Sequence, residues 1–155
     1  MNVIYKFAET DDEFEQAKAL FAEYANSLDI DLSFQNFSKE LESIRSQYDK
    51  PTGALLLVYK AGSLAGCAGI RRLDHDIAEL KRMYVRPDHR GLSLGRELLE
   101  RAIEKAALLG YKKIRLDTLS SMTKARNLYE TFGFKPIDAY YFNPIADTIY
   151  MERVI

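Results

Sequence analysis

The 155-residue chain is poor in cysteine and histidine and has no tryptophan. Its one cysteine, Cys67, excludes an intrachain disulfide, and with only His75 and His89 beside it no cluster of metal ligands is apparent, so we expect no metal. The chain also lacks any apolar run of about 18 residues, and residues 1–6 lack the apolar segment of a secretory leader. These absences predict a cytoplasmic protein without a membrane partner.

An excess of charge of either sign is missing as well. Twenty-two basic residues face 23 acidic ones, and a net charge of −1 argues against a nucleic-acid partner. Apolar residues make up 47% of the chain and charged residues 29%, which is typical of a globular protein. Because no repeat, linker or low-complexity tract divides the chain, we expect residues 1–155 to form a single domain.

The spacing of apolar residues predicts a mixed order of elements, β-α-α-β-β-β-α-β-α-β-β. The expected strands are residues 3–7, 54–59, 64–70, 77–85, 113–117, 134–139 and 147–154. A first helix is expected to begin at Thr10, and three more are expected over residues 34–48, 94–106 and 122–132. Thr10 and Glu13 form a capping-box pattern at the start of the first helix. This order indicates the α/β class, with one twisted sheet covered by helices.

The segment from Arg90 to Arg96 carries the strongest functional pattern. It follows a strand that ends before Pro87 and opens an amphipathic helix. The first turn of a helix favours an anion, glycines such as Gly91 and Gly95 permit close approach, and arginines add charged donors. These features suit a pyrophosphate, although a plain strand–turn–helix connection with solvated arginines would have the same composition.

Several motifs in sequence order resemble those of the GNAT N-acetyltransferase superfamily. Residues 90–95, Arg-Gly-Leu-Ser-Leu-Gly, resemble its Arg/Gln-x-x-Gly-x-Gly/Ala motif, with Ser93 at the middle glycine. Residues 79–85 resemble its fourth strand, and residues 128–134 resemble its Leu-Tyr-x-x-x-Gly-Phe signature. Met122 stands where many members have an asparagine. The resemblance spans roughly residues 77–134 and implies a mostly antiparallel sheet of about six or seven strands with about four helices.

The resemblance implies an acetyl-CoA-dependent N-acetyltransferase that works by direct attack in a ternary complex. The implied acetyl-CoA site consists of Met83, Tyr84, Val85, Arg90, Gly91, Leu92, Ser93, Leu94, Gly95 and Arg96. Ser93 tolerates a positive φ less well than glycine, and its hydroxyl could either crowd a phosphate or donate to it. Ser93 and Met122 leave a second reading open, a sensor that binds acyl-CoA without turnover. A third interpretation is a nucleotide-binding protein, but the loop lacks the Gly-Lys-Ser/Thr residues that end a P-loop motif.

Two residues are candidates for proton transfer. Glu79 is at the position that the resemblance assigns to the general base, and an ion pair with Lys81 or Arg82 is the alternative. Tyr129 is the candidate acid for the leaving thiolate, because a phenol is protonated at neutral pH. Its alternative is core packing on the helix face that includes Ala125 and Phe132.

The resemblance places the acceptor between residues 21–48 and residues 139–144. Tyr140, Tyr141 and Phe142 there could line an amine pocket, form a hydrophobic hairpin or make a dimer contact. The resemblance implies that the acceptor is a small-molecule amine or a peptide. The sequence does not decide whether the protein forms a homodimer. Cys67, in an apolar strand, is expected to be a buried small side chain and not a nucleophile. Arg71 is expected at the polar rim of a hairpin.

Overall fold

A computed structural model describes residues 2–28, 36–91 and 93–155. Its seven-stranded sheet has the order β1-β2-β3-β4-β5-β7-β6, and only the β4–β5 pair is parallel. The strands are β1 (Val3–Phe7), β2 (Ala54–Lys60), β3 (Ser63–Asp74), β4 (Ile77–Val85), β5 (Lys113–Leu119), β6 (Lys135–Ile137) and β7 (Thr148–Val154). The predicted mixed fold with a mostly antiparallel sheet is therefore confirmed.

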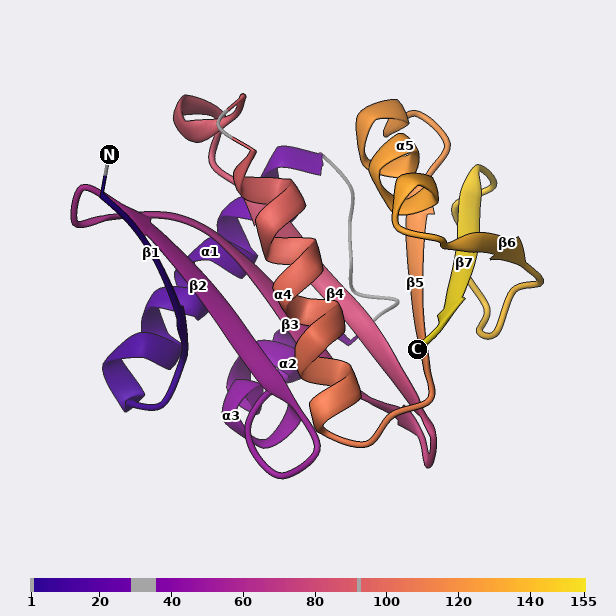
Figure 1. Cartoon of the computed structure of the whole chain (residues 1–155), viewed down its shortest axis with the longest axis horizontal. Helices are drawn as coiled ribbons and strands as arrows, with labels where there is room; N and C mark the ends of the chain where they lie inside the picture. The colour runs from indigo at the N-terminus through magenta and orange to yellow at the C-terminus, as the bar shows by residue number, and fades with distance from the viewer. Residues whose placement is uncertain (1, 29–35, 92) are drawn as a thin grey trace.

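Helices cover both faces of this sheet (Figure 1). Helices α1 (Asp11–Leu28), α2 (Phe37–Glu42) and α3 (Ile44–Gln47) pack on one face, and α4 (Leu94–Leu108) and α5 (Thr123–Thr131) on the other. The short helix η2 (Pro87–His89) joins β4 to the loop before α4. No helix in the described ranges is long and apolar enough to cross a membrane.

The start of α1 has the geometry that its sequence predicts. The Thr10 hydroxyl accepts the Glu13 N–H at 3.2 Å, and the Glu13 carboxylate accepts the N–H groups of Glu9 and Thr10 at 2.9 and 3.1 Å. Partial burial alone would raise the pKa of Glu13, but these backbone donors and Lys6 lower that pKa to about 2. The capping box is confirmed as the signal that begins this helix.

The predicted helix over residues 34–48 is wrong in its continuity. Phe34 lies outside the described residues, and from Phe37 onward two short helices, α2 and α3, replace one long helix. The break is at Ser43, whose N–H and hydroxyl both donate to the Lys39 carbonyl, at 3.0 and 2.7 Å. A serine side chain that binds the backbone in this way competes with the regular helix. Glu40 and Ile44 nevertheless both remain buried.

Strands β4 and β5 are neighbours for only part of their length. Residues 77–79 of β4 pair with residues 113–115 of β5, and the two strands then continue to Val85 and Leu119 without pairing to each other. Next to this point β4 has a bulge against β3 at Arg82, whose φ is +57°. The bulge places the consecutive side chains of Lys81 and Arg82 on the face covered by α1 and α2. The sheet is therefore open on one side of β4.

Candidate active site

Two connected hollows occupy the place where β4 and β5 diverge. The larger is a groove of about 490 Å³ between the end of β4, the end of β5 and the start of α5. The smaller, inner hollow is about 60 Å³ and lies between β4, β5, α1 and residues 143–145. The residues that line both are Tyr24, Leu80, Arg82, Asp117, Thr118 and Met122. The two hollows therefore adjoin at these residues.

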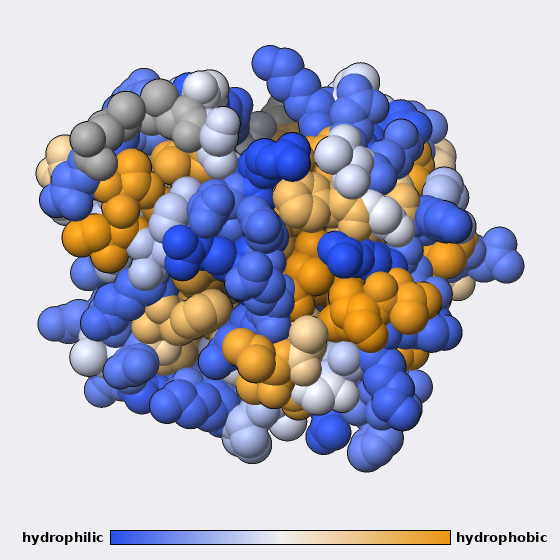
Figure 2. Space-filling view, in the orientation of Figure 1, coloured by the Kyte–Doolittle hydropathy of each residue, from blue (hydrophilic) through white to orange (hydrophobic). Residues whose placement is uncertain are grey.

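The predicted strand residues line the groove. Met83, Tyr84 and Val85 form one wall, beyond the last β4–β5 pair, where the edge of β4 has no partner from β5. Apolar side chains gather on the molecular surface between α4 and the C-terminal strands, within a mostly hydrophilic face (Figure 2). An extended ligand arm can pair with such a free strand edge in the way that a neighbouring strand would.

Of the predicted loop residues, Arg90 lines the groove, and Gly91 and Ser93 follow it in the chain. Gly91 has φ +84°, and a Cβ there would have no atom within 4 Å, so the space above it is open. Ser93 does adopt the left-handed region, with φ +62° at the N-cap of α4, and its side chain makes no capping hydrogen bond. A serine at this position therefore keeps the loop geometry at the cost of backbone strain. Leu92 lies outside the described residues.

The remaining loop residues divide by position. Arg90 lines the groove, and its Nε donates to the Val85 carbonyl at 3.1 Å. Arg96 lies over the ring of Phe132, 5.0 Å from its centroid, and is not among the groove residues. Leu94 is 3% exposed, so only its backbone could contact a bound anion. A Cβ added at Gly95 would lie 3.9 Å from the Val85 side chain, which is an ordinary van der Waals contact.

Tyr129 lines the groove and also belongs to the core. Its side chain is 7% exposed and makes an edge contact with Phe134 at 5.8 Å between ring centroids. Burial, with smaller contributions from Tyr24 and Asp117, raises the pKa of Tyr129 well above its ordinary value. The phenol is therefore fully protonated at neutral pH, which is the state that a proton donor to a thiolate needs.

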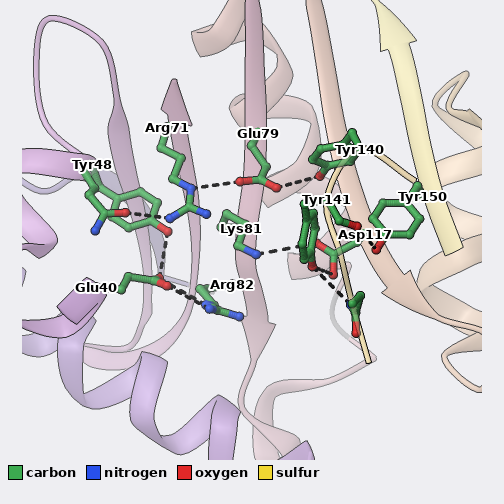
Figure 3. A network of polar contacts seen from close by, with 12 residues as sticks. Glu40, Tyr48, Arg71, Glu79, Lys81, Arg82, Asp117, Tyr140, Tyr141 and Tyr150 are labelled. Atoms are coloured by element: carbon green, nitrogen blue, oxygen red, sulfur yellow. Dashed lines mark hydrogen bonds and ion pairs between the residues drawn. The ribbon is translucent and has the colours of Figure 1, made fainter. Parts of the chain in front are cut away.

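Glu79 has both carboxylate oxygens engaged and is 2% exposed. Arg71 Nε donates to it at 3.0 Å and the Tyr140 hydroxyl at 2.7 Å (Figure 3). The expected ion pair of Glu79 is present, with Arg71 as its partner at 3.0 Å, and the charge of Glu79 also acts on Lys81. Arg71 is not a free rim residue, because it joins Glu79 to Gln47. Glu79 lines neither the groove nor the inner hollow.

A second set of charged side chains surrounds the inner hollow. Arg82 binds the buried Glu40 through Nε and Nη2 at 3.2 and 2.9 Å. Asp117 accepts the Tyr141 hydroxyl at 2.8 Å and lies 3.6 Å from Lys81 Nζ. Figure 3 shows Lys81 and Tyr141 both pointing toward Asp117. Burial lowers the pKa of Lys81, and it raises the pKa of Tyr141 with help from Asp117.

Sequence reasoning missed Asp117, which it treated only as the end of a strand. Asp117 is the acidic side chain that lines both hollows, and it does so because β5 has left β4 two residues earlier. That divergence is a tertiary feature, and no local pattern in the sequence encodes it. Thr118 was missed for the same reason, whereas Tyr24 lies within residues 21–48, where the acceptor was expected. Of residues 139–144, where the acceptor was expected, Asn143 lines the inner hollow, whereas Tyr140, Tyr141 and Phe142 line neither hollow.

Comparison with known proteins gives a consistent result. The model of the acetyltransferase (GNAT) family matches residues 7–134. An uncharacterised N-acetyltransferase of Schizosaccharomyces pombe is 37% identical, with 90% of this chain and 87% of that protein covered. One of Dictyostelium discoideum is 31% identical, with 95% and 96% covered. A crystal structure of an acetyltransferase from Streptococcus agalactiae superposes with a TM-score of 0.79 at 24% identity, covering 99% of this chain and 98% of that one.

Proposed function

The chain belongs to the acetyltransferase (GNAT) family, and from this membership we propose that it transfers the acetyl group of acetyl-CoA directly to a primary amine of a small molecule or peptide. The observation that supports direct transfer is the junction of the two hollows at Leu80, Asp117 and Thr118. Donor and acceptor can be bound there at the same time. We also propose that residues 1–155 act as one domain.

The residues of the groove fit acetyl-CoA. The open space at Gly91, the start of α4 and the guanidinium of Arg90 suit its pyrophosphate. The free edge of β4 at residues 83–85 suits its pantetheine arm, and backbone N–H groups there would polarise a carbonyl. When bound, acetyl-CoA supplies a thioester whose acyl carbon reacts with the amine.

Proton transfer in this proposal involves Tyr129 and Glu79. The amine nitrogen forms a C–N bond to the acyl carbon as the C–S bond breaks. An ammonium loses two protons in all: the base takes one, and the other replaces the proton that Tyr129 gives to the thiolate. Tyr129 would donate that proton, because it is protonated and lines the groove. Glu79 lines neither hollow, so it would accept a proton that reaches it through water, while Arg71 and Tyr140 hold its carboxylate in place. In this proposal Glu79 acts as the general base without direct contact with the amine.

Titration calorimetry with acetyl-CoA, free CoA and ATP tests the donor, with Arg90→Glu as the variant. Arg101→Glu is the matched control, since Arg101 is an exposed arginine of α4 that pairs with Glu97 at 3.0 Å and lies outside the groove. We expect Arg90→Glu to weaken acetyl-CoA binding and Arg101→Glu to leave it unchanged. Thiol release over an amine panel tests the transfer. Tight acetyl-CoA binding with no thiol release for any amine would identify a sensor instead.

A further inference from the structure

The inner hollow is lined by buried charges of both signs. Lys81 and Arg82 contribute the cations, and Asp117 the anion. The side chains of the two cations are each 4% exposed, and that of Asp117 is 13% exposed. Charge interactions are stronger at such depth than in water. A ligand in this hollow is therefore selected by its own charges.

The contacts of Asp117 leave room for a further donor. One oxygen accepts the Tyr141 hydroxyl at 2.8 Å, and the other is 3.6 Å from Lys81 Nζ, which is beyond ordinary hydrogen-bond length. A carboxylate has about four lone-pair sites. Asp117 also lines the groove, so an amino group that it holds would lie beside the thioester position.

The charge balance around the hollow limits what can enter. The three cations Arg71, Lys81 and Arg82 face the three carboxylates Glu40, Glu79 and Asp117, so these six groups together carry no net charge. A simple amine enters as a cation and adds a positive charge that nothing in this set offsets. Burying such a charge without an opposite charge is unfavourable. A ligand with one ammonium and one carboxylate adds no net charge.

The size of the hollow agrees with this. At about 15 Å³ for each water-sized position, 60 Å³ holds about four. That matches an amino group, one carbon and a carboxylate better than it matches a bulky ring.

We propose, on the basis of the acetyl transfer proposed above, that the acceptor is a small zwitterionic amine such as a free amino acid. Its ammonium group binds Asp117, and its carboxylate binds at Lys81 and Arg82. Asn143 lies on the same wall, with its Nδ2 3.3 Å from the Tyr141 hydroxyl, and fixes the tyrosine that orients Asp117.

Thiol release with matched acceptors tests the proposal. Each of several amino acids is compared with its amide and with the amine that lacks the carboxyl group. We expect kcat/KM to be at least about 100-fold higher for the amino acid, because the other two leave buried charges unmatched. Equal rates within a set, or preference for the amide or for a peptide N-terminus, overturn the zwitterion and leave acetyl transfer intact. Acetyl-CoA binding without turnover of any acceptor overturns both.

Variants locate the two ends of the acceptor. Lys81→Met should reduce the preference for the amino acid to below about 5-fold, whereas Lys81→Arg should keep most of it. Lys113→Met is the matched control, since the Lys113 side chain is 44% exposed and lines neither hollow. A Lys81→Met protein that binds acetyl-CoA normally and still prefers the amino acid by 100-fold overturns the assignment of Lys81. Asp117→Asn should raise the KM for the amino acid.

Discussion

Replacement of Glu40 by glutamine should destabilise the fold more than any surface substitution. Glu40 is 2% exposed and is held by two hydrogen bonds from Arg82 and one from Tyr48 at 2.9 Å. Glutamine keeps the shape and one acceptor but removes the carboxylate charge that faces the buried Arg82 guanidinium. Breaking a buried pair costs about 3–5 kcal/mol, and we expect about 3 here because one acceptor survives. For a protein of this size each kcal/mol shifts Tm by about 2–4 °C, so Tm should fall by about 6–12 °C.

The pH dependence of the free energy of unfolding gives a second, independent test of the Glu40–Arg82 pair. Burial alone would raise the pKa of Glu40, but the hydrogen bonds and charge of Arg82 and the Tyr48 hydroxyl outweigh it and lower that pKa. A lowered folded-state pKa stabilises the fold above the ordinary glutamate value of about 4.5, and that contribution is lost as pH falls through the folded-state pKa. The wild-type protein should therefore lose this increment in acid, and Glu40→Gln should not.

Urea unfolding from pH 7 to pH 3 measures both effects, and Arg82→Met with the double variant completes a mutant cycle. The double variant should be more stable than the sum of the single losses predicts, since it leaves no unpaired charge. A loss below 1 kcal/mol in Glu40→Gln at pH 7 would refute the reasoning, because the Arg82 guanidinium would then have to be solvated.

Three further outcomes follow from the geometry. Tyr129→Phe should lower kcat by about 10²-fold or more with little change in the Kd for acetyl-CoA, and unchanged turnover in thiol release would remove Tyr129 from the mechanism. Ser93→Gly removes a left-handed serine but adds chain entropy, so urea unfolding should show a gain of no more than about 1 kcal/mol; a clear loss would contradict the strain at φ +62°. Thr10→Ala should cost about 1 kcal/mol in thermal unfolding through the lost cap, and no loss would mean that Glu13 alone secures this end of α1.

Elements with a complete local pattern could be predicted from the sequence. The helix predicted over residues 94–106 is present as α4, and its helical spacing of apolar residues gives the buried face directly. The residues on that face are Leu94, Leu98, Leu99, Ala102, Ile103 and Ala106. Cys67 is fully buried with a pKa raised by burial, as a cysteine inside an apolar strand should be. The last hairpin was predicted in place, although β6 is limited to residues 135–137.

Other features depend on contacts between distant segments. The helix break at Ser43 is a local exception, since the serine hydroxyl binds a carbonyl only four residues earlier and the apolar spacing does not show it. Arg71 was predicted at a rim because the residues around it are polar, yet register pairs it with Glu79 on the next strand. The candidate catalytic residues came from motifs, whereas Asp117 requires knowledge of where β5 leaves β4. Motifs therefore identify the donor side better than the acceptor side.

The short ladder between β4 and β5 also makes a seam in the molecule. Only three residue pairs join the two parts of the sheet, and the chain crosses from one part to the other once, between α4 and β5 (Figure 1). A cut at Gly110 would therefore yield two pieces, each of which keeps its own strand neighbours. Lys81 and Arg82 would belong to one piece, and Asp117 and Tyr129 to the other. Because neither piece holds a complete site, recovery of acetyl transfer on mixing would report that the two had rejoined.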